Sequence, residues 1–220
     1  MTVVQPDGYL ALPEAGIGPG VLVLHAWWGL NPTFKDLCNR LAREGFVAFA
    51  PDLYHGQLAT TVAEAQDLSD RLEEKQAGTD ISNAVKYLQS LPAVTGPALA
   101  VIGFSLGAFF ALDLSCQRPQ DIHLVVIFYG TRPGDYASAQ AAYLGHFAES
   151  DEYEPASDVK QLEKSLRSAD RPVTFYTYPG TSHWFFEKDR ADAYNAQAAG
   201  LAWQRTVESL LAAFASKENH

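Results

Sequence analysis

Short apolar runs alternate along the chain with segments in which apolar residues recur every three or four positions. The runs are rich in Val, Ile and Leu and have the length of strands that are buried on both faces of a sheet. They predict six strands, over residues 20–28, 46–51, 98–104, 123–130, 141–147 and 172–180.

The segments between these runs have the periodicity and the terminal residues of helices. In residues 31–45, Asn31 can cap the first turn, Pro32 takes the first helical position and Gly45 ends the helix. Strands that alternate with helices are typical of an α/β fold, with a mostly parallel sheet covered on both faces. Because no internal repeat or linker interrupts the pattern, we expect one domain spanning residues 1–220. Further helices are predicted over residues 61–76, 79–91, 106–117 and 192–214, and around 159–166.

The composition favours a globular protein and argues against a nucleic-acid or membrane partner. Hydrophobic residues make up 47% of the chain and charged residues 19%, which favours a packed core over disorder. The 26 acidic residues outnumber the 16 Lys and Arg residues, and the formal charge of −10 would repel a phosphate backbone. We therefore expect no nucleic-acid partner. No apolar segment is long enough to span a membrane, so no membrane association is expected either.

The two cysteines, Cys38 and Cys116, fall in predicted helices and form no metal-binding pair. They are expected to be free thiols, which suit a reducing compartment. Residues 1–16 lack the basic and apolar regions of a signal peptide. We therefore expect a cytoplasmic protein, either a monomer or a homodimer.

The stretch VIGFSLGAFF, residues 101–110, places a serine between two glycines at a predicted strand-to-helix turn. Catalytic residues of parallel sheets gather at the carboxyl ends of the strands, where Ser105 lies. Gly103, Ser105 and Gly107 match G-x-S-x-G, a turn so sharp that flanking side chains would strike the backbone. The serine would then sit at a helix N-terminus, which favours developing negative charge. The two glycines could instead serve close strand–helix packing alone.

A serine hydroxyl needs a base to take its proton, and that base is usually histidine. His183 follows the last predicted strand and precedes the last helix, the position expected when serine, acid and histidine occur in that order. The less favourable candidates lie in a loop, in strands or at the chain end, namely His55, His123, His146 and His220.

The acid of a triad should lie between the serine and the histidine, at the carboxyl end of a strand. Asp151 follows a predicted strand by a few residues and could orient His183. Glu149 and Glu152 remain alternatives, and together with Glu154 these carboxylates could form only a solvated acidic loop.

At this point the chain resembles the dienelactone hydrolase family of α/β-hydrolases along nearly its whole length. The resemblance implies an α/β-hydrolase fold with Ser105 as nucleophile, Asp151 as acid and His183 as base. It also implies an oxyanion hole formed by the backbone N–H groups of Leu106 and Trp27. The stretches that carry it are VLVLHAWWGLNPTFKDLCNRLAREGFVAFAPDLYHGQ, GFSLGA, GHFAESDEYEP and YPGTSHWFF.

Three positions differ from the dienelactone enzymes themselves. Those enzymes have a cysteine where this chain has Ser105, and a glutamate that partners the cysteine where it has Ala26. Both are changed together here, as expected when a serine is activated through histidine instead. Those enzymes also have an arginine for the substrate carboxylate where this chain has Glu187. A glutamate would repel that carboxylate, so dienelactone itself is not the expected substrate.

Aromatic residues adjoin the proposed catalytic positions, although aromatic residues at strand ends are often ordinary core. Arg132 follows a strand end and could meet an anionic substrate group, or it could be a surface arginine without a role. Tyr54 and His55 could also reach the pocket, and residues 57–78 are where a lid would be sought. The substrate-binding candidates are Trp28, Phe104, Tyr129, Arg132, Trp184 and Glu187.

Together these features predict hydrolysis of a small, partly apolar ester or lactone through an acyl-enzyme intermediate, without a metal or organic cofactor. The alternatives on the same scaffold are a thioesterase, a peptidase or an acyltransferase. A homologue that binds a ligand without turnover is the alternative from a different class.

Overall fold

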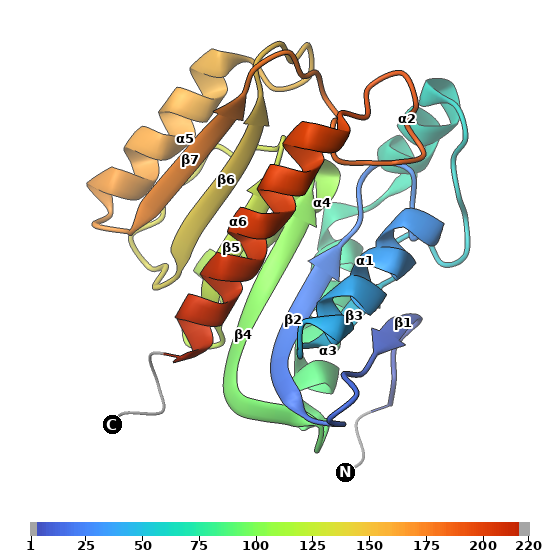
Figure 1. Cartoon of the computed structure of the whole chain (residues 1–220), viewed down its shortest axis with the longest axis vertical. Coiled ribbons are helices and arrows are strands. Elements are labelled where there is room, and N and C mark those ends of the chain that lie inside the picture. Colours follow the sequence, from blue (N-terminus) through green and yellow to red (C-terminus); the bar gives the residue numbers. More distant parts are fainter. Residues whose placement is uncertain (1–3, 216–220) are drawn as a thin grey trace.

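The computed structural model describes residues 4–215, which form a seven-stranded sheet with helices on both faces (Figure 1). The strand order is β1-β3-β2-β4-β5-β6-β7. Only β1 runs antiparallel to its neighbour, and every other neighbouring pair in the described chain is parallel. The predicted mostly parallel α/β sheet is therefore confirmed. The strands are β1 (Gly8–Ala11), β2 (Gly18–Leu24), β3 (Val47–Pro51), β4 (Val94–Phe104), β5 (Ile122–Phe128), β6 (Ala142–Ala148) and β7 (Val173–Tyr178).

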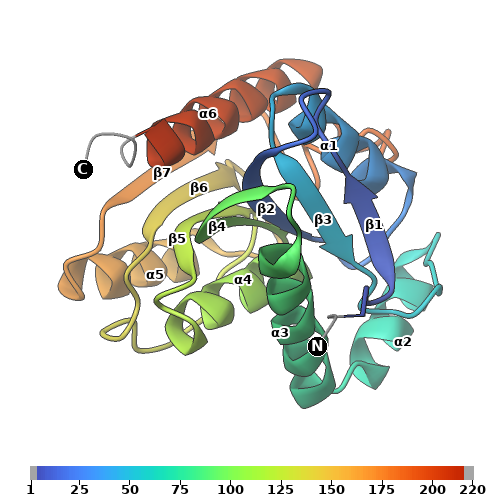
Figure 2. The same cartoon turned by 90° about the horizontal axis from the view of Figure 1, so that it is seen from below.

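Helices α1 and α6 cover one face of the sheet, and α3, α4 and α5 cover the other (Figure 2). Successive side chains of a strand point to opposite faces, so the buried residues of the sheet feed two separate cores. In β2, Val21 and Val23 pack in the core with α1 and α6, whereas Leu22 and Leu24 pack in the core with α3, α4 and α5. The helices are α1 (Pro32–Arg43), α2 (Val62–Arg71), α3 (Glu74–Ser90), α4 (Leu106–Gln117), α5 (Ala156–Ser168) and α6 (Ala196–Ala215).

One strand was not predicted. Residues 8–11 form β1, which pairs with β3 along the edge of the sheet. The strand has only four residues, of which only Ala11 is buried, so it carries little of the apolar signal that marks the buried strands.

Two helix boundaries also differ from the predictions. The break between α2 and α3 falls at Leu72 and Glu73, whose backbones are extended, and not near Gly78. Gly78 lies inside α3, since a single glycine costs a helix only about 1 kcal/mol. The last helix begins at Ala196 and not near Asp192, because Asn195 accepts the N–H of Ala198 and ends the preceding loop.

Within residues 4–215, no helix combines the length and the apolar character that a membrane crossing requires. Cys38 in α1 and Cys116 in α4 are both free thiols, as predicted. Burial raises the pKa of the Cys38 thiol to about 12, so this group stays protonated and serves as core.

Candidate active site

Ser105 occupies a strained turn between β4 and α4. Its backbone has φ 49° and ψ −111°, in a region that residues with a side chain rarely adopt. The Ser105 N–H donates to the carbonyl of Phe128 at the end of β5 (2.9 Å), which holds the turn against the neighbouring strand. Strain of this kind persists where the surrounding structure enforces it, and it is concentrated at functional sites.

The flanking glycines are required by the close approach of backbones. A Cβ on Gly103 would lie 2.4 Å from the carbonyl oxygen of Gly107, and a Cβ on Gly107 would lie 2.2 Å from that of Leu24. Real Cβ atoms do not approach backbone atoms this closely. The sequence motif therefore reflects the sharp turn that places the serine, as predicted from G-x-S-x-G.

The structure brings Ser105, His183 and Asp151 together from three separate loops. The Ser105 Oγ lies 3.0 Å from the His183 Nε2. The other ring nitrogen, Nδ1, lies 2.9 Å and 2.8 Å from the two carboxylate oxygens of Asp151. The side chains of His183 and Asp151 are each only 4% exposed, so water does not screen the pair. This geometry can move a proton from a hydroxyl to an imidazole that a carboxylate orients.

The acid loop distinguishes Asp151 from the other candidate carboxylates. Asp151 Oδ1 also accepts the N–H groups of Tyr153 and Glu154, each at 3.0 Å, and these bonds fix the carboxylate toward the imidazole. Glu149 instead accepts the N–H of Gly180 (2.9 Å) and ties the end of β6 to the end of β7. Glu152 is exposed to solvent.

The remaining histidine candidates lie elsewhere. His146 is buried between the Tyr178 and Thr206 hydroxyls, and burial, with the nearby Arg205 charge, lowers its pKa to about 3. His55 is exposed beside Asp7 and Asp80. His123 lies in β5, and His220 is outside the described residues.

The two predicted oxyanion donors lie on segments that follow neighbouring strands of the sheet. Leu106 is the first residue of α4, where a backbone N–H has no acceptor within the helix. Trp27 lies in the loop after β2, in a turn that the Gly29 N–H closes on the carbonyl of Ala26 (3.2 Å). Both segments end at the same edge of the sheet, because β2 and β4 are parallel neighbours.

Three aromatic rings pack around the imidazole of His183. The ring centroids of Tyr129, Tyr153 and Trp184 lie 4.9, 4.9 and 5.0 Å from its own. Tyr153 also contacts Trp27 (5.8 Å between ring centroids) and is 39% exposed, so its ring lies at the surface beside the imidazole. The sequence analysis did not identify Tyr153 as a site residue, although its position two residues after the candidate acid could have indicated it.

Several predicted substrate-binding side chains are part of the core. Phe104 is fully buried and packs against Phe34, Phe128 and Phe186, which excludes it from direct contact with a substrate in this structure. Trp28 is 1% exposed and packs edge-on against Trp184, which is itself buried. Phe104, Trp28 and Trp184 are therefore core residues, which was the alternative given for aromatic residues at strand ends.

The structure does not bring Arg132 to the serine. Its guanidinium pairs with Glu74 in α3 (2.8 Å) and Asp113 in α4 (3.1 Å) and lies over the Phe109 ring. Two carboxylates pair with the cation there, so Arg132 is not free to bind an anionic substrate group in this arrangement, which favours the alternative of an arginine without a role in the site. Tyr54 is likewise buried, against the His25 ring.

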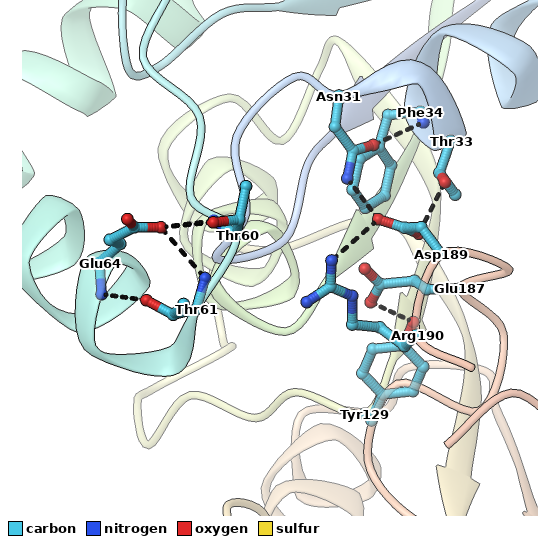
Figure 3. A network of polar contacts seen from close by, with 10 residues as sticks. All are labelled: Asn31, Thr33, Phe34, Thr60, Thr61, Glu64, Tyr129, Glu187, Asp189 and Arg190. Atoms are coloured by element: carbon cyan, nitrogen blue, oxygen red, sulfur yellow. Dashed lines mark hydrogen bonds and ion pairs between the residues drawn. The ribbon is translucent and has the colours of Figure 1, made fainter. Parts of the chain in front are cut away.

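Glu187 is fully buried and does not face solvent as a free carboxylate. Its Oε1 accepts the Tyr129 hydroxyl at 2.7 Å, with Asp189 and Arg190 beside it on the same loop (Figure 3). Burial raises the pKa of Glu187 to about 8, and the nearby Asp189 charge adds to the rise. The group is therefore largely uncharged at neutral pH, and the expected repulsion of a substrate carboxylate does not apply there.

A second buried carboxyl lies in the acid loop. Burial raises the pKa of Glu154 to about 7, partly offset by its hydrogen bond from the Thr131 hydroxyl (2.7 Å). Across the part of the chain that the structure describes, no three His, Cys, Asp or Glu side chains are grouped so that they could hold a metal ion. The absence of a cofactor stays a prediction.

The chain is similar in sequence to known proteins over almost its entire length. The model of the "Dienelactone hydrolase family" matches residues 7–214. "Protein usf" of Aquifex pyrophilus is 33% identical, over 93% of this chain and 92% of that protein. A "Putative carboxymethylenebutenolidase" of Aquifex aeolicus is 30% identical with the same coverage of both chains.

The fold is also similar to that of solved structures. The crystal structure titled "Putative Dienelactone Hydrolase" from Klebsiella pneumoniae superposes with a TM-score of 0.82 at 26% identity. The match covers 94% of this chain and 92% of that one. The α/β-hydrolase fold expected from the sequence is confirmed.

Proposed function

The chain belongs to the dienelactone hydrolase family, and from this premise we propose that it is a serine hydrolase of small esters or lactones. The observation that carries the proposal is the continuous chain of contacts from Ser105 Oγ through His183 to Asp151, at 3.0 and 2.8 Å. A hydroxyl aligned with an imidazole and a buried carboxylate is the arrangement that activates a serine.

In the proposed reaction, His183 Nε2 takes the proton of Ser105 as Oγ attacks the carbonyl carbon. The N–H groups of Leu106 and Trp27 stabilise the oxyanion, and each such donor is worth about 10²–10³ in rate. Asp151 holds the imidazole in the required tautomer and stabilises its charged form. His183 then gives the proton to the leaving alcohol, and water attacks the acyl-enzyme by the same route.

The charges near the site favour an uncharged substrate. Arg132 is engaged by Glu74 and Asp113, and the Arg190 guanidinium stacks on Trp28 at 3.9 Å. Neither cation is placed to compensate a carboxylate on the substrate. The name carboxymethylenebutenolidase among the relatives points to lactones as one substrate class, and we extend that class to neutral lactones and short esters.

A fluorophosphonate probe tests the nucleophile directly. We expect one covalent adduct, located on Ser105 by peptide mass spectrometry, because only a serine deprotonated by His183 attacks phosphorus rapidly. Ser182 is exposed and adjacent to the histidine, and it should remain unlabelled. Absence of any adduct in protein with native circular dichroism would favour a ligand-binding homologue without turnover.

The variant Asp151→Asn tests the acid. We expect kcat on a neutral ester to fall by about 10³- to 10⁴-fold, because an amide no longer selects the imidazole tautomer that accepts the serine proton. Glu152→Gln is the matched control, since this neighbouring carboxylate is exposed and should be dispensable. Equal losses in the two variants would contradict the assignment of Asp151.

A further inference from the structure

The loop that carries His183 also carries Glu187, and a buried hydrogen bond connects that loop to the end of β5. Tyr129 donates its hydroxyl to Glu187 Oε1 at 2.7 Å, and both side chains are fully buried. The Tyr129 ring lies against the imidazole of His183, with 4.9 Å between the ring centroids. The hydrogen bond thus joins the ring beneath the imidazole to the loop on which that imidazole is held.

The backbone at both ends of this connection is strained. Within residues 4–215, five residues other than glycine have a positive φ, and three of them are Ser105, Tyr129 and Trp184. Tyr129 (φ 36°) directly follows β5, and Trp184 (φ 65°) directly follows His183. Strained residues need contacts that hold them, and the Tyr129–Glu187 bond spans the two strained segments.

Aromatic rings surround the Tyr129 side of this bond. Facing Tyr129 are the rings of Phe104, Phe128 and Phe185 together with the imidazole of His183, so His183 is the titratable neighbour among them. The charged groups that act on the pair are Asp189 and Arg190 of the same loop, and Asp151. The second carboxyl oxygen of Glu187 is buried without a partner.

We propose that Tyr129 and Glu187 are positioning residues: their hydrogen bond holds the Tyr129 ring against the His183 imidazole and keeps the histidine loop closed over Ser105. The proposal rests on the function proposed above, with His183 as the base. It predicts a defect in turnover and not in substrate binding, since neither side chain is exposed to a substrate in this structure.

Ionisation of Glu187 is expected to weaken this arrangement. A carboxylate at this place would be buried with one oxygen unpartnered, and opening of the loop would solvate it. The raised pKa of Glu187, about 8, places this event on the alkaline side of neutrality. We therefore expect kcat of the wild type to fall as the pH rises past about 8, whereas Glu187→Gln, which cannot ionise, keeps its kcat to higher pH.

Steady-state kinetics on a neutral short-chain p-nitrophenyl ester tests the proposal. Tyr129→Phe leaves Glu187 without its donor, and we expect kcat to fall about 10- to 100-fold with KM within about threefold. Glu187→Leu should give a similar loss, because the Tyr129 hydroxyl is then unsatisfied. Glu187→Gln keeps an acceptor for that hydroxyl and should recover most of the turnover at pH 7.

The matched control is Tyr143→Phe. Tyr143 is buried in the core on the other face of the sheet and is hydrogen-bonded to the Ser115 Oγ at 2.8 Å, so its replacement removes an equivalent bond far from the histidine loop. A comparable loss of thermal stability with kcat within about twofold of the wild type is expected. If Tyr129→Phe affects kcat no more than Tyr143→Phe does, or if Glu187→Gln and the wild type share one alkaline profile, the proposal is overturned.

A spectroscopic signal separates this proposal from the proposed function. The proton between His183 Nδ1 and Asp151 should give a resolved downfield resonance in the NMR spectrum. We expect Tyr129→Phe to broaden or remove it, and Tyr143→Phe and Glu187→Gln to retain it at pH 7. Loss of the resonance in Tyr129→Phe would support the positioning role, whether or not Ser105 reacts with a fluorophosphonate. Failure of wild-type Ser105 to react with that probe would count only against the proposed serine hydrolase. Retention of an unchanged resonance in Tyr129→Phe would count against the positioning role.

Discussion

Ser105→Ala is expected to lower kcat/KM for a neutral short-chain ester by about 10⁴-fold or more. The substitution removes the atom that forms the acyl-enzyme, while His183, Asp151 and the N–H groups of the turn remain in place. The residual rate, about 10³-fold above the uncatalysed reaction, would come from the oxyanion donors and substrate binding alone. Initial rates at several substrate concentrations, with active-site titration of the wild type, measure the loss.

The matched control is Ser182→Ala, which removes an exposed hydroxyl next to His183. This variant should keep the wild-type kcat/KM, since Ser182 makes no side-chain contact that the proposed reaction uses. The fold of Ser105→Ala should be unaffected, because the backbone N–H of residue 105, which binds Phe128, is retained. Wild-type turnover in Ser105→Ala would show that another group attacks the substrate.

Glu187→Gln is expected to make the protein more stable than the wild type at alkaline pH, and the difference should grow as the pH rises. In the unfolded chain this carboxyl has its ordinary pKa of 4.5, and burial raises the pKa to about 8 in the folded protein. The folded state therefore binds a proton that the unfolded state has released, so the stabilising contribution is complete below pH 4.5 and is lost as the pH rises through 8.

Between pH 4.5 and pH 8, each pH unit lowers the free energy of unfolding of the wild type by about 1.4 kcal/mol. The total loss approaches about 5 kcal/mol by pH 9. The amide of Glu187→Gln stays neutral and avoids this loss. Urea unfolding of both proteins from pH 5 to pH 9 measures the difference, with the exposed Glu152→Gln as control. Parallel curves for the wild type and Glu187→Gln would mean that the carboxyl is not buried in solution.

The two predictions for Glu187 concern one ionisation observed in two ways. Stability records the free-energy cost of the charge, whereas the alkaline kcat profile records whether the histidine loop opens to relieve it. His183 and Glu187 are four residues apart on the same loop. Opening of the loop to solvate the Glu187 carboxylate would therefore also displace the His183 imidazole.

The strands and helices that build the centre of the sheet could be predicted from apolar periodicity. Strands such as β5 and β6 are buried on both faces, so nearly every residue along them carries the same signal. The edge strand β1 was not predicted because its extended backbone is stabilised by pairing with β3. Its own run of apolar residues is too short to indicate a strand. The break after α2 was misplaced because the extended backbone at Leu72 is a feature of the packed chain and leaves no mark as clear as a glycine.

The order of serine, acid and histidine along the chain was sufficient to nominate Ser105 and His183, whereas Asp151 was preferred to Glu149 and Glu152 through the family resemblance. Each lies just after a strand, and parallel strands deliver their carboxyl ends to one edge of the sheet. The roles of Glu187 and Arg132 could not be deduced in this way. Their partners, Tyr129 for the first and Glu74 and Asp113 for the second, are distant in sequence, and only the packed structure shows that these partners engage the two side chains.

The sequence by itself determined the α/β fold and nominated Ser105 and His183, because these are encoded in local patterns: apolar periodicity, a glycine-flanked turn and the positions of strand ends. The choice of Asp151 as the candidate acid rested on the family resemblance. The tertiary structure alone decided which carboxylates are charged and which aromatic rings are core. Burial and long-range hydrogen bonds control ionisation, and these arise only when separate segments pack together.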